Sequence, residues 1–456
     1  MSRKLSITLV VGLLSFAFAC TGWTASTPEE IARLGKDLTF VGAEKAGNQA
    51  GTIPAWDGGI TAPPAGYKKG MDYIDPYADD KILLTIDTSN MEQYSDKLTK
   101  GYKALLKAYP TYKMNIYPTH RSASMPQRIY DATKRIAEKA KLVDGGNGVE
   151  NVGEGFPFPI PENGLEVIWN HLLRWRVDTV DRYYTSAPVM ANGSYVGVRV
   201  RQRTEFNYSK AGATDANLDN KLLSFISKVL APPRNAGRIL LIIDAINQEK
   251  ERRKAWVYNP GQRRVRRAPH IAFDNPGIAM DGLFTSDQTD MYNGSPERYN
   301  WKLIGKQEMY VPYNAYKLKS RSLEYADIIR PKHVNPDYLR YELHRVWKVE
   351  GTLKEGTRHI YKKRVFYIDE DSWNIITAEY YDKRDQLWRV HESHTINYYD
   401  VPTTWTVCDC SYDLENGRYG VNYLSNEEKE LWKFNDDAKF KDKLFTVNSL
   451  RRSGRR

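Results

Sequence analysis

The sequence predicts an α+β protein built on one large, curved antiparallel sheet that helices and long loops cover. The first observation is the stretch from Tyr341 to Tyr399, where apolar and polar residues alternate in segments separated by polar turns. A period of two marks a strand with one buried face, and strands joined by short turns form an antiparallel meander. The second observation is an aromatic content of 12%, which favours an extended sheet or an aromatic-lined cavity over a helical bundle.

The meander is expected to contain four strands. These strands are 341–353, 360–368, 373–381 and 388–398, with turns at 354–357, 369–372 and 382–385. The second turn, Asp369-Glu370-Asp371-Ser372, is a carboxylate cluster, and its place between two strands predicts a solvated turn. The apolar face carries Trp347, Trp373 and Trp388. Other elements must therefore cover that face.

Residues 20–178 are predicted to form a helical and loop region that packs on the sheet. Thr27, Pro28 and Glu30 form a helix start, and Asn163 followed by Glu166 forms another. The expected elements are helices at 28–35, 90–108, 124–145 and from 164, a loop at 42–70 anchored by Trp56, and an irregular proline-rich segment at 155–161.

Residues 179–425 are predicted to form the β-rich part of the chain. Asn192-Gly193 closes a hairpin over 181–208, since this dipeptide is the strongest short hairpin signal. The other expected elements are a short helix at 218–230, a strand at 239–246, a hairpin at 253–267, and strands at 301–307 and 316–323. Residues 426–456 are expected to form a C-terminal helix, near 426–434, and a basic tail.

The N-terminus has the pattern of a secretory signal peptide, residues 1–19. Arg3 and Lys4 precede an apolar run, and Ala17-Phe18-Ala19 is an A-x-A cleavage site. The run is short for a membrane span. Because Cys20 follows the cleavage site directly, the pattern leaves two products open: a soluble exported protein, or a lipoprotein carrying a lipid on Cys20. A cut after Ala25 is a further alternative.

The formal charge of +11 is spread along the chain. It favours anionic surfaces, but no recognition module accompanies it, so we expect no nucleic-acid partner. Four arginines, Arg263, Arg264, Arg266 and Arg267, form one local cluster. They either guard a strand edge or contact a partner or a lipid headgroup.

No catalytic, metal or cofactor motif is present in the sequence. The eight histidines are scattered, and His391 and His394 fall on opposite sides of a strand. Cys408 and Cys410 flank Asp409, a spacing that is a poor zinc signal. They are either two small residues in a sheet or a strained disulfide. We therefore predict a protein that is not an enzyme and needs no cofactor.

Several motifs resemble known bacterial families. Trp256-Val257-Tyr258-Asn259-Pro260 with the arginines after it resembles a hairpin of outer-membrane lipoprotein-sorting (LolA/LolB-like) carriers. Gly51–Trp56, Phe156–Glu166, His344–Trp347 and Arg364–Asp371 resemble the bacterial domain-of-unknown-function family number 1329. The resemblance implies an incomplete β-barrel around an apolar cavity, located in the periplasm or at the outer membrane. It also implies an inner-membrane transporter and an outer-membrane protein as partners, and it supplies no catalytic residues.

These observations together predict a carrier or accessory protein for a hydrophobic or lipid-like ligand. The expected cavity wall consists of Trp256, Tyr258, Trp347, Trp373 and Trp388. The alternatives are a secreted hydrolase acting on lipids or polyesters, which needs a convergent Ser/His/Asp cluster, and a structural outer-membrane lipoprotein.

The signal peptide generates a first testable prediction. Intact-mass analysis of the protein from cell envelopes should show the loss of residues 1–19, because the A-x-A site precedes Cys20. An added diacylglyceryl mass would select the lipoprotein form. Full-length protein retained in the cytosol would contradict export.

Overall fold

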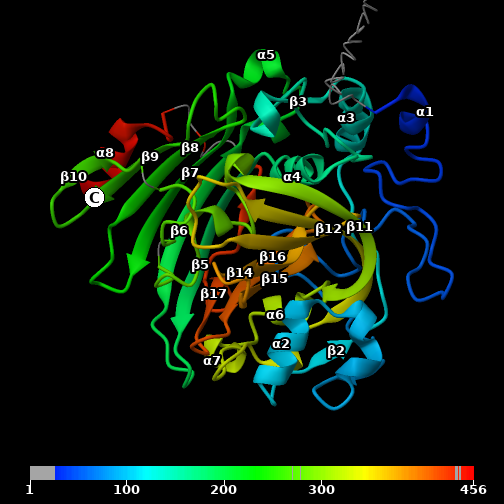
Figure 1. Ribbon diagram of the computed structural model, residues 1–456. Coiled ribbons are helices and arrows are strands. Elements are labelled where there is room, and N and C mark those ends of the chain that lie inside the picture. Colours follow the sequence, from blue (N-terminus) through cyan, green and yellow to red (C-terminus); the bar gives the residue numbers. More distant parts are fainter. Residues whose placement is uncertain (1–25, 270, 278, 437–439, 441–442, 456) are drawn as a thin grey trace, which may run out of the picture.

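The computed structural model describes residues 26–269, 271–277, 279–436, 440 and 443–455. In these residues sixteen strands form one curved sheet (Figure 1), in the order β1-β2-β12-β13-β14-β15-β16-β17-β5-β6-β7-β8-β9-β10, with β11 paired to β12 and β18 to β5. The strands are β1 Leu84–Ile86, β2 Met114–Ile116, β5 Thr179–Val189, β6 Val198–Phe206, β7 Lys221–Ala231, β8 Ile239–Ala245, β9 Lys254–Asn259, β10 Arg264–Arg267, β11 Tyr299–Pro312, β12 Tyr341–Leu353, β13 Lys363–Asp369, β14 Ile375–Tyr381, β15 Leu387–Asn397, β16 Thr404–Asp413, β17 Tyr419–Leu424 and β18 Lys433–Phe434. β3 Lys141–Val143 and β4 Gly148–Glu150 form a separate pair.

The predicted fold class is confirmed. The meander from β12 to β15 is antiparallel throughout. The sheet is not closed: β10 ends one side of the strand order, and β1 and β11 end the other. The hairpins β5–β6 and β9–β10 lie where turn chemistry predicted them.

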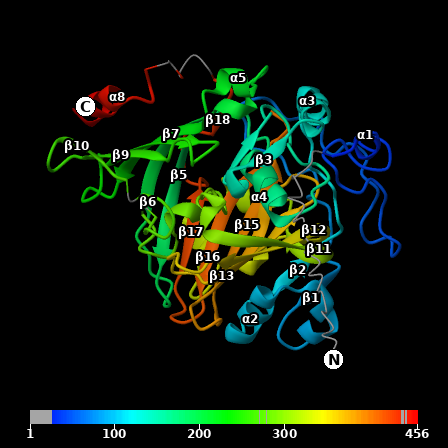
Figure 2. The same ribbon diagram turned by 45° about the horizontal axis from the view of Figure 1, so that its top comes forward.

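The helices lie on the rim and flanks of the sheet (Figures 1 and 2). They are α1 Pro28–Ile31, α2 Lys100–Ala108, α3 Gln127–Ala137, α4 Gly164–Leu172, α5 Asp215–Leu218, α6 Tyr316–Lys319, α7 Tyr325–Ile328 and α8 Val447–Arg455. Thr27 and Asn163 cap α1 and α4 as predicted. The helix expected over 90–108 is divided into a 3-10 segment, Met91–Lys97, and α2, which Thr99 caps. None of the described helices has both the length and the apolar character needed to cross a membrane.

Three predicted elements are wrong. The helix expected at 218–230 is strand β7. Both faces of this strand are covered, so its apolar residues lack a period of two and also fit helical spacing. The strand expected at 316–323 begins with the helical turn α6. The helix expected at 426–434 contains β18, because Trp432 and Phe434 pack on Tyr398. The C-terminal helix is α8, and it includes the basic tail.

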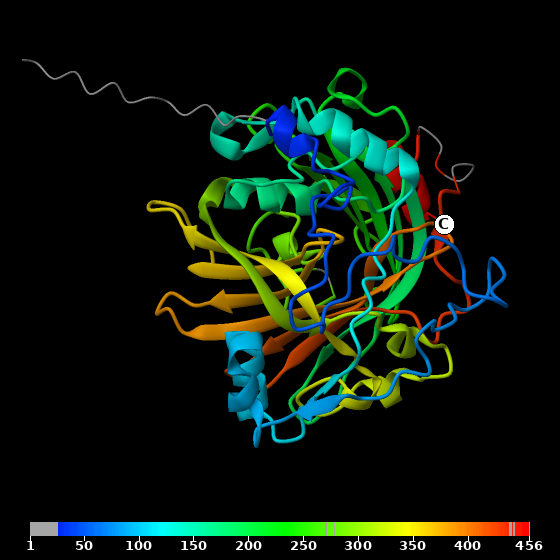
Figure 3. The same cartoon turned by 90° about the vertical axis from the view of Figure 1, so that its right-hand side faces the viewer.

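The N-terminal segment runs as an extended chain across the sheet (Figure 3). Trp56 anchors it, since its indole Nε1 donates to the carbonyl of Ala123 at 3.3 Å and its ring packs edge-on against Phe40 and Tyr130. Arg345 of β12 donates to the carbonyl of Ala46 at 3.0 Å. The loop at 42–70 is therefore part of the cover of the sheet.

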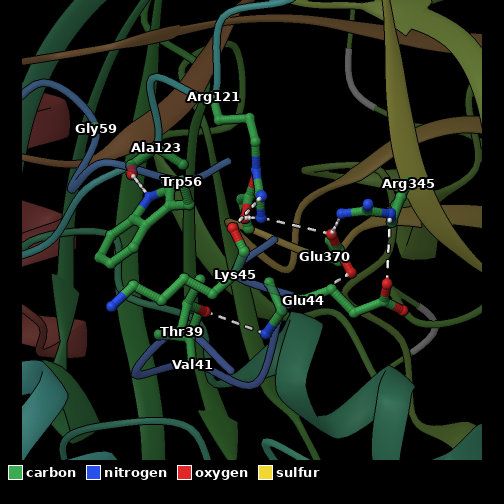
Figure 4. A network of polar contacts seen from close by, with 12 residues as sticks. Thr39, Val41, Glu44, Lys45, Trp56, Gly59, Arg121, Ala123, Arg345 and Glu370 are labelled. Carbon is green, nitrogen blue, oxygen red and sulfur yellow. Dashed lines mark hydrogen bonds and ion pairs between the residues drawn. The ribbon is translucent and has the colours of Figure 1, made fainter. Parts of the chain in front are cut away.

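The turn Asp369–Ser372 is buried, so the prediction of a solvated turn is wrong. Asp369, Glu370 and Asp371 are 0%, 2% and 5% exposed. Arg121 binds both carboxylate oxygens of Asp371, at 2.9 and 2.6 Å. Glu370 lies between Lys306 Nζ at 2.8 Å and Arg345 Nη1 at 3.4 Å. Figure 4 shows its contacts with Arg121 and Arg345. Glu370 and Asp371 can be buried because cations from distant parts of the chain neutralise them.

The buried pair generates a second prediction. Replacing Arg121 with Met should lower the free energy of unfolding by about 3–5 kcal/mol, because Asp371 is left as an uncompensated buried charge. Chemical denaturation measures the loss. Arg33→Met is the matched control, since both side chains of the Arg33–Asp37 ion pair are exposed to solvent. Its unfolding midpoint should not change. Equal effects of the two variants would contradict the assignment.

Candidate functional site: a pocket on the inner face of β5 to β8

A cavity of about 170 Å³ lies between the inner face of β5–β8 and a loop formed by residues 271–277 and 279–289, called here the loop 271–289. The strand registers place Tyr184 opposite Val200, and Ser227 opposite both Gln202 and Leu240. Because residues two apart on a strand share a face, these side chains form one wall. The loop supplies the opposite wall through Ile271, Met280 and Phe284.

The polar groups of this pocket are mostly uncharged. Ser186 donates to Asn422 at 2.5 Å, and Gln202 accepts a hydrogen bond from Arg182 Nε at 2.9 Å. Of the 19 lining residues only Arg238 is charged, and none is a carboxylate. Ten of the 19 lining residues are apolar or aromatic, and eight others carry a hydroxyl, amide or guanidinium group. Apolar surface combined with polar groups that can orient a ligand is typical of a small-molecule site.

Two larger depressions are less suited to an apolar ligand. One, of about 830 Å³, is lined by Trp388 together with six charged residues and His359 among its 11 lining residues. The other, of about 630 Å³, has aromatic residues including Trp432 and seven charged residues among 16. Burying an apolar chain there would desolvate many charges, which costs free energy. The smaller pocket is therefore the better candidate.

The loop 271–289 is held on the sheet at its far side. Arg389 donates to the carbonyl of Gly282 at 2.9 Å, and Ser411 donates to that of Leu283 at 3.1 Å. Phe284 packs edge-on against His391, with ring centroids 4.6 Å apart. These contacts fix the loop to β15 and β16, while its apolar residues cover β6–β8.

Residues 85–451 match the family described as "Protein of unknown function (DUF1329)". The chain belongs to the DUF1329 family. The resemblance of its sequence motifs to family number 1329 is thereby confirmed. This DUF1329 chain is also 49% identical to the uncharacterized protein PA3922 of Pseudomonas aeruginosa, over 99% of both chains.

Two solved structures share parts of this architecture. A DUF1329 family protein from Desulfovibrio piger is 13% identical, with a TM-score of 0.42, over 60% of this chain and 92% of the other. The LolA superfamily protein NE2245 from Nitrosomonas europaea is 12% identical, with a TM-score of 0.38, over 63% of this chain and 100% of the other. At these TM-scores the likeness supports no inference about function.

The five aromatic residues predicted to line a cavity lie in three separate places in this DUF1329 protein. Trp256 and Tyr258 lie opposite Leu241 and Ile239, on the outer face of the sheet. There they pack with Leu450 of α8, and Tyr258 donates to the carbonyl of Gly454 at 2.9 Å. The structure therefore places this pair on the face that does not line the β5–β8 pocket.

The other three aromatics lie on the meander. Trp347 stacks on Trp373, with ring centroids 6.2 Å apart, and Lys306 lies over the Trp347 ring. Trp373 is fully buried and donates to the carbonyl of Val41 at 3.0 Å. Trp388 lines the large charged depression and donates to Asp413 at 3.1 Å. Their role in ligand binding stays a prediction.

One sequence pattern does point to this pocket. Val198 and Val200 alternate with arginines on β6, and both valines face inward and are buried in the structure. The loop 271–289 has no periodicity, so no pattern predicted that it covers the sheet. Cys20 lies outside the described residues.

The motif Cys408-Asp409-Cys410 lies inside β16. Both thiols are free and buried, with the two Sγ atoms 3.6 Å apart, which agrees with two small residues in a sheet. Asp409 Oδ1 accepts hydrogen bonds from Ser393 at 2.8 Å and Thr406 at 2.7 Å. Burial raises the pKa of Asp409 to about 6, and the nearby carboxylate of Asp290 adds to this effect.

Asp409 generates a third prediction. Its folded-state pKa lies above the unfolded value, so the folded state binds the proton more tightly. Its contribution to stability is therefore lost as the pH rises from about 4 through 6, by roughly 3 kcal/mol for two pKa units. Asp409→Asn should flatten the dependence of unfolding free energy on pH in this window.

The matched control is Asp79→Asn, because Asp79 is exposed. This variant should keep the wild-type pH profile in denaturant titrations between pH 4 and 8. An Asp409→Asn profile that parallels the wild type would show that Asp409 does not titrate in this window.

Proposed function

We propose that this DUF1329 protein is an exported carrier or accessory protein that holds a lipid-like molecule in the β5–β8 pocket. The observation that carries the proposal is the composition of the pocket: 18 uncharged lining residues and one arginine. The export signal at residues 1–19 supports a periplasmic location. A transporter in the inner membrane and a protein in the outer membrane are the partners that the motif resemblance suggests.

The size of the pocket narrows the kind of ligand. Sites for drug-sized molecules have volumes of about 300–1,000 Å³, and this cavity has about 170 Å³. A cavity of this volume is too small for a drug-sized ring system, and a single alkyl chain is the narrow apolar group that fits it best. Each buried methylene contributes about 0.8 kcal/mol, so a chain can be held without covalent chemistry.

The position of Arg238 favours an anionic or neutral end group on that chain. Arg238 precedes β8 and shares the inner face with Leu240 and Ile242. It is exposed at the edge of the pocket, and among the described residues it forms no ion pair. A fatty acid would place its carboxylate there and its chain between the sheet and the loop.

The hydrolase alternative finds no support in the described residues. No serine hydroxyl hydrogen-bonds a histidine among them. Thr111 Oγ1 contacts His333 Nε2 at 2.8 Å, but the other ring nitrogen faces the carbonyl of Val334. The Thr111–His333 pair therefore lacks the carboxylate that orients the histidine ring in a catalytic triad.

Filling the pocket is the experiment that tests this function. Ser227→Trp places an indole on the inner face beside Gln202 and Leu240. We expect the affinity for a fluorescent fatty acid to fall at least tenfold, because the added ring occupies the space that the chain needs. Fluorescence titration gives the Kd, and circular dichroism checks the fold.

Arg203→Trp is the matched control, because it places the same indole on the outer face of β6, opposite Ile226. This variant should bind like the wild type. Failure of the wild type to bind fatty acid, its methyl ester or phospholipid monomers would refute the proposal. So would equal affinities of the two variants.

A further inference from the structure

A histidine and two aspartates lie close together where β12 begins and β13 ends, which is the open end of this hairpin. This place is away from the β5–β8 pocket. His344 lies on β12, Asp369 ends β13, and Asp371 lies in the turn that follows. Each offers one ligand atom, and these atoms all lie within 4.8 Å of one another. The three side chains are buried, with 2%, 0% and 5% exposure.

We propose that His344, Asp369 and Asp371 bind a divalent transition-metal ion. Ligand atoms at about 2.0–2.2 Å from one ion lie about 3.3–3.6 Å apart when the site is tetrahedral. The three atoms of this group lie within 4.8 Å of one another, so binding needs them to approach by up to roughly 1.5 Å. This site is independent of the proposed lipid pocket.

The observation that points to a ligand is a free oxygen on Asp369. Its Oδ2 accepts hydrogen bonds from Tyr313 at 3.1 Å and from the backbone N and Oγ of Ser372, at 3.0 and 2.5 Å. Its Oδ1 is buried and has no hydrogen-bond partner. Among the described residues no cation pairs with this carboxylate. A buried anionic oxygen without a partner is costly, and a metal ion removes that cost.

His344 has the arrangement of a metal ligand. Its Nε2 lies 3.1 Å from Glu342 Oε2. When Nε2 carries the proton and donates it to Glu342, the lone pair lies on Nδ1. Histidines that bind metals usually donate their second nitrogen to a carboxylate in this way. Tyr313 stacks on the imidazole with ring centroids 3.9 Å apart, which fixes the ring.

Asp371 is held in place by Arg121, which occupies one direction on each of its two oxygens. A carboxylate oxygen has a second lone pair, so Asp371 can bind a cation while it keeps this contact. All three side chains are therefore oriented by neighbours before any ion arrives.

The charge of the surrounding network also favours a dication. The ion pairs around this group join five carboxylates to four cationic side chains, and Asp369 adds a sixth carboxylate that has no ion pair among the described residues. The paired carboxylates are Glu44, Asp80, Glu342, Glu370 and Asp371, and the cations are Arg121, Lys306, Arg340 and Arg345. The difference is two negative charges when the histidines are neutral. One imidazole and two carboxylates suit Mn²⁺ or Zn²⁺.

The experiment is a metal titration of the full chain after treatment with a chelator and its removal. Mn²⁺ binding is followed by electron paramagnetic resonance, and Zn²⁺ binding by calorimetry. We expect one ion per chain and a melting temperature that rises with metal concentration. Asp369→Asn should weaken the affinity at least tenfold, since it removes the free anionic oxygen.

Asp37→Asn is the matched control, because it makes the same substitution at an exposed carboxylate that pairs with Arg33 and lies outside this network. It should bind metal like the wild type. If Asp369→Asn fails to fold, His344→Gln decides the question in the same assay. Absence of stoichiometric Mn²⁺ and Zn²⁺ binding by the wild type would overturn the proposal. Unchanged affinity in a folded Asp369→Asn or His344→Gln chain would do the same.

Discussion

The contact between Arg121 and Asp371 holds together parts of the chain that are far apart in sequence. Arg121 Nη1 also donates to the carbonyls of Lys45 and Pro54, both at 3.4 Å. Glu370 accepts from the backbone N of Glu44 and from Lys306 of β11. One buried group of charges thus joins the N-terminal loop, β11, β12 and the β13–β14 turn. Such a group is stable only when every charge has its partner, so the loop and the sheet must be in place together.

The same arrangement explains where space remains in the molecule. The N-terminal segment covers the meander, where Trp56 anchors it to Ala123 and Trp373 of the meander donates to the carbonyl of Val41. The loop between β10 and β11 covers the inner face of β5–β8 instead. Contacts with β15 and β16 hold this loop, and a cavity remains between it and the strands. The pocket therefore lies in the half of the sheet that the N-terminal segment does not cover.

Local patterns predicted most of the fold. Alternation predicted the meander, Asn192-Gly193 predicted the β5–β6 hairpin, and Thr27 and Asn163 predicted helix starts. The burial of Asp369–Asp371 could not be predicted in this way, since Arg121 is 250 residues away from Asp371. The site was harder still. The abundance of large aromatic residues predicts an aromatic cavity wall, but the pocket is lined mainly by smaller residues such as Val200 and Ser227, together with a loop that has no periodicity.

The helix α8 has a consequence for how the chain reaches its final state. It covers the outer face of β8–β10, and Gly454 lies so close to Tyr258 that a Cβ there would come within 2.3 Å of the ring. The three strands under α8 precede it by far in the sequence. The last of them, β10, ends at Arg267, whereas α8 begins at Val447. In a chain that emerges from its N-terminus, the residues of β8–β10 therefore appear long before the helix that covers them. Ile239, Leu241 and Tyr258 stay uncovered until α8 has docked, so this edge of the sheet is the last part of the fold to be completed.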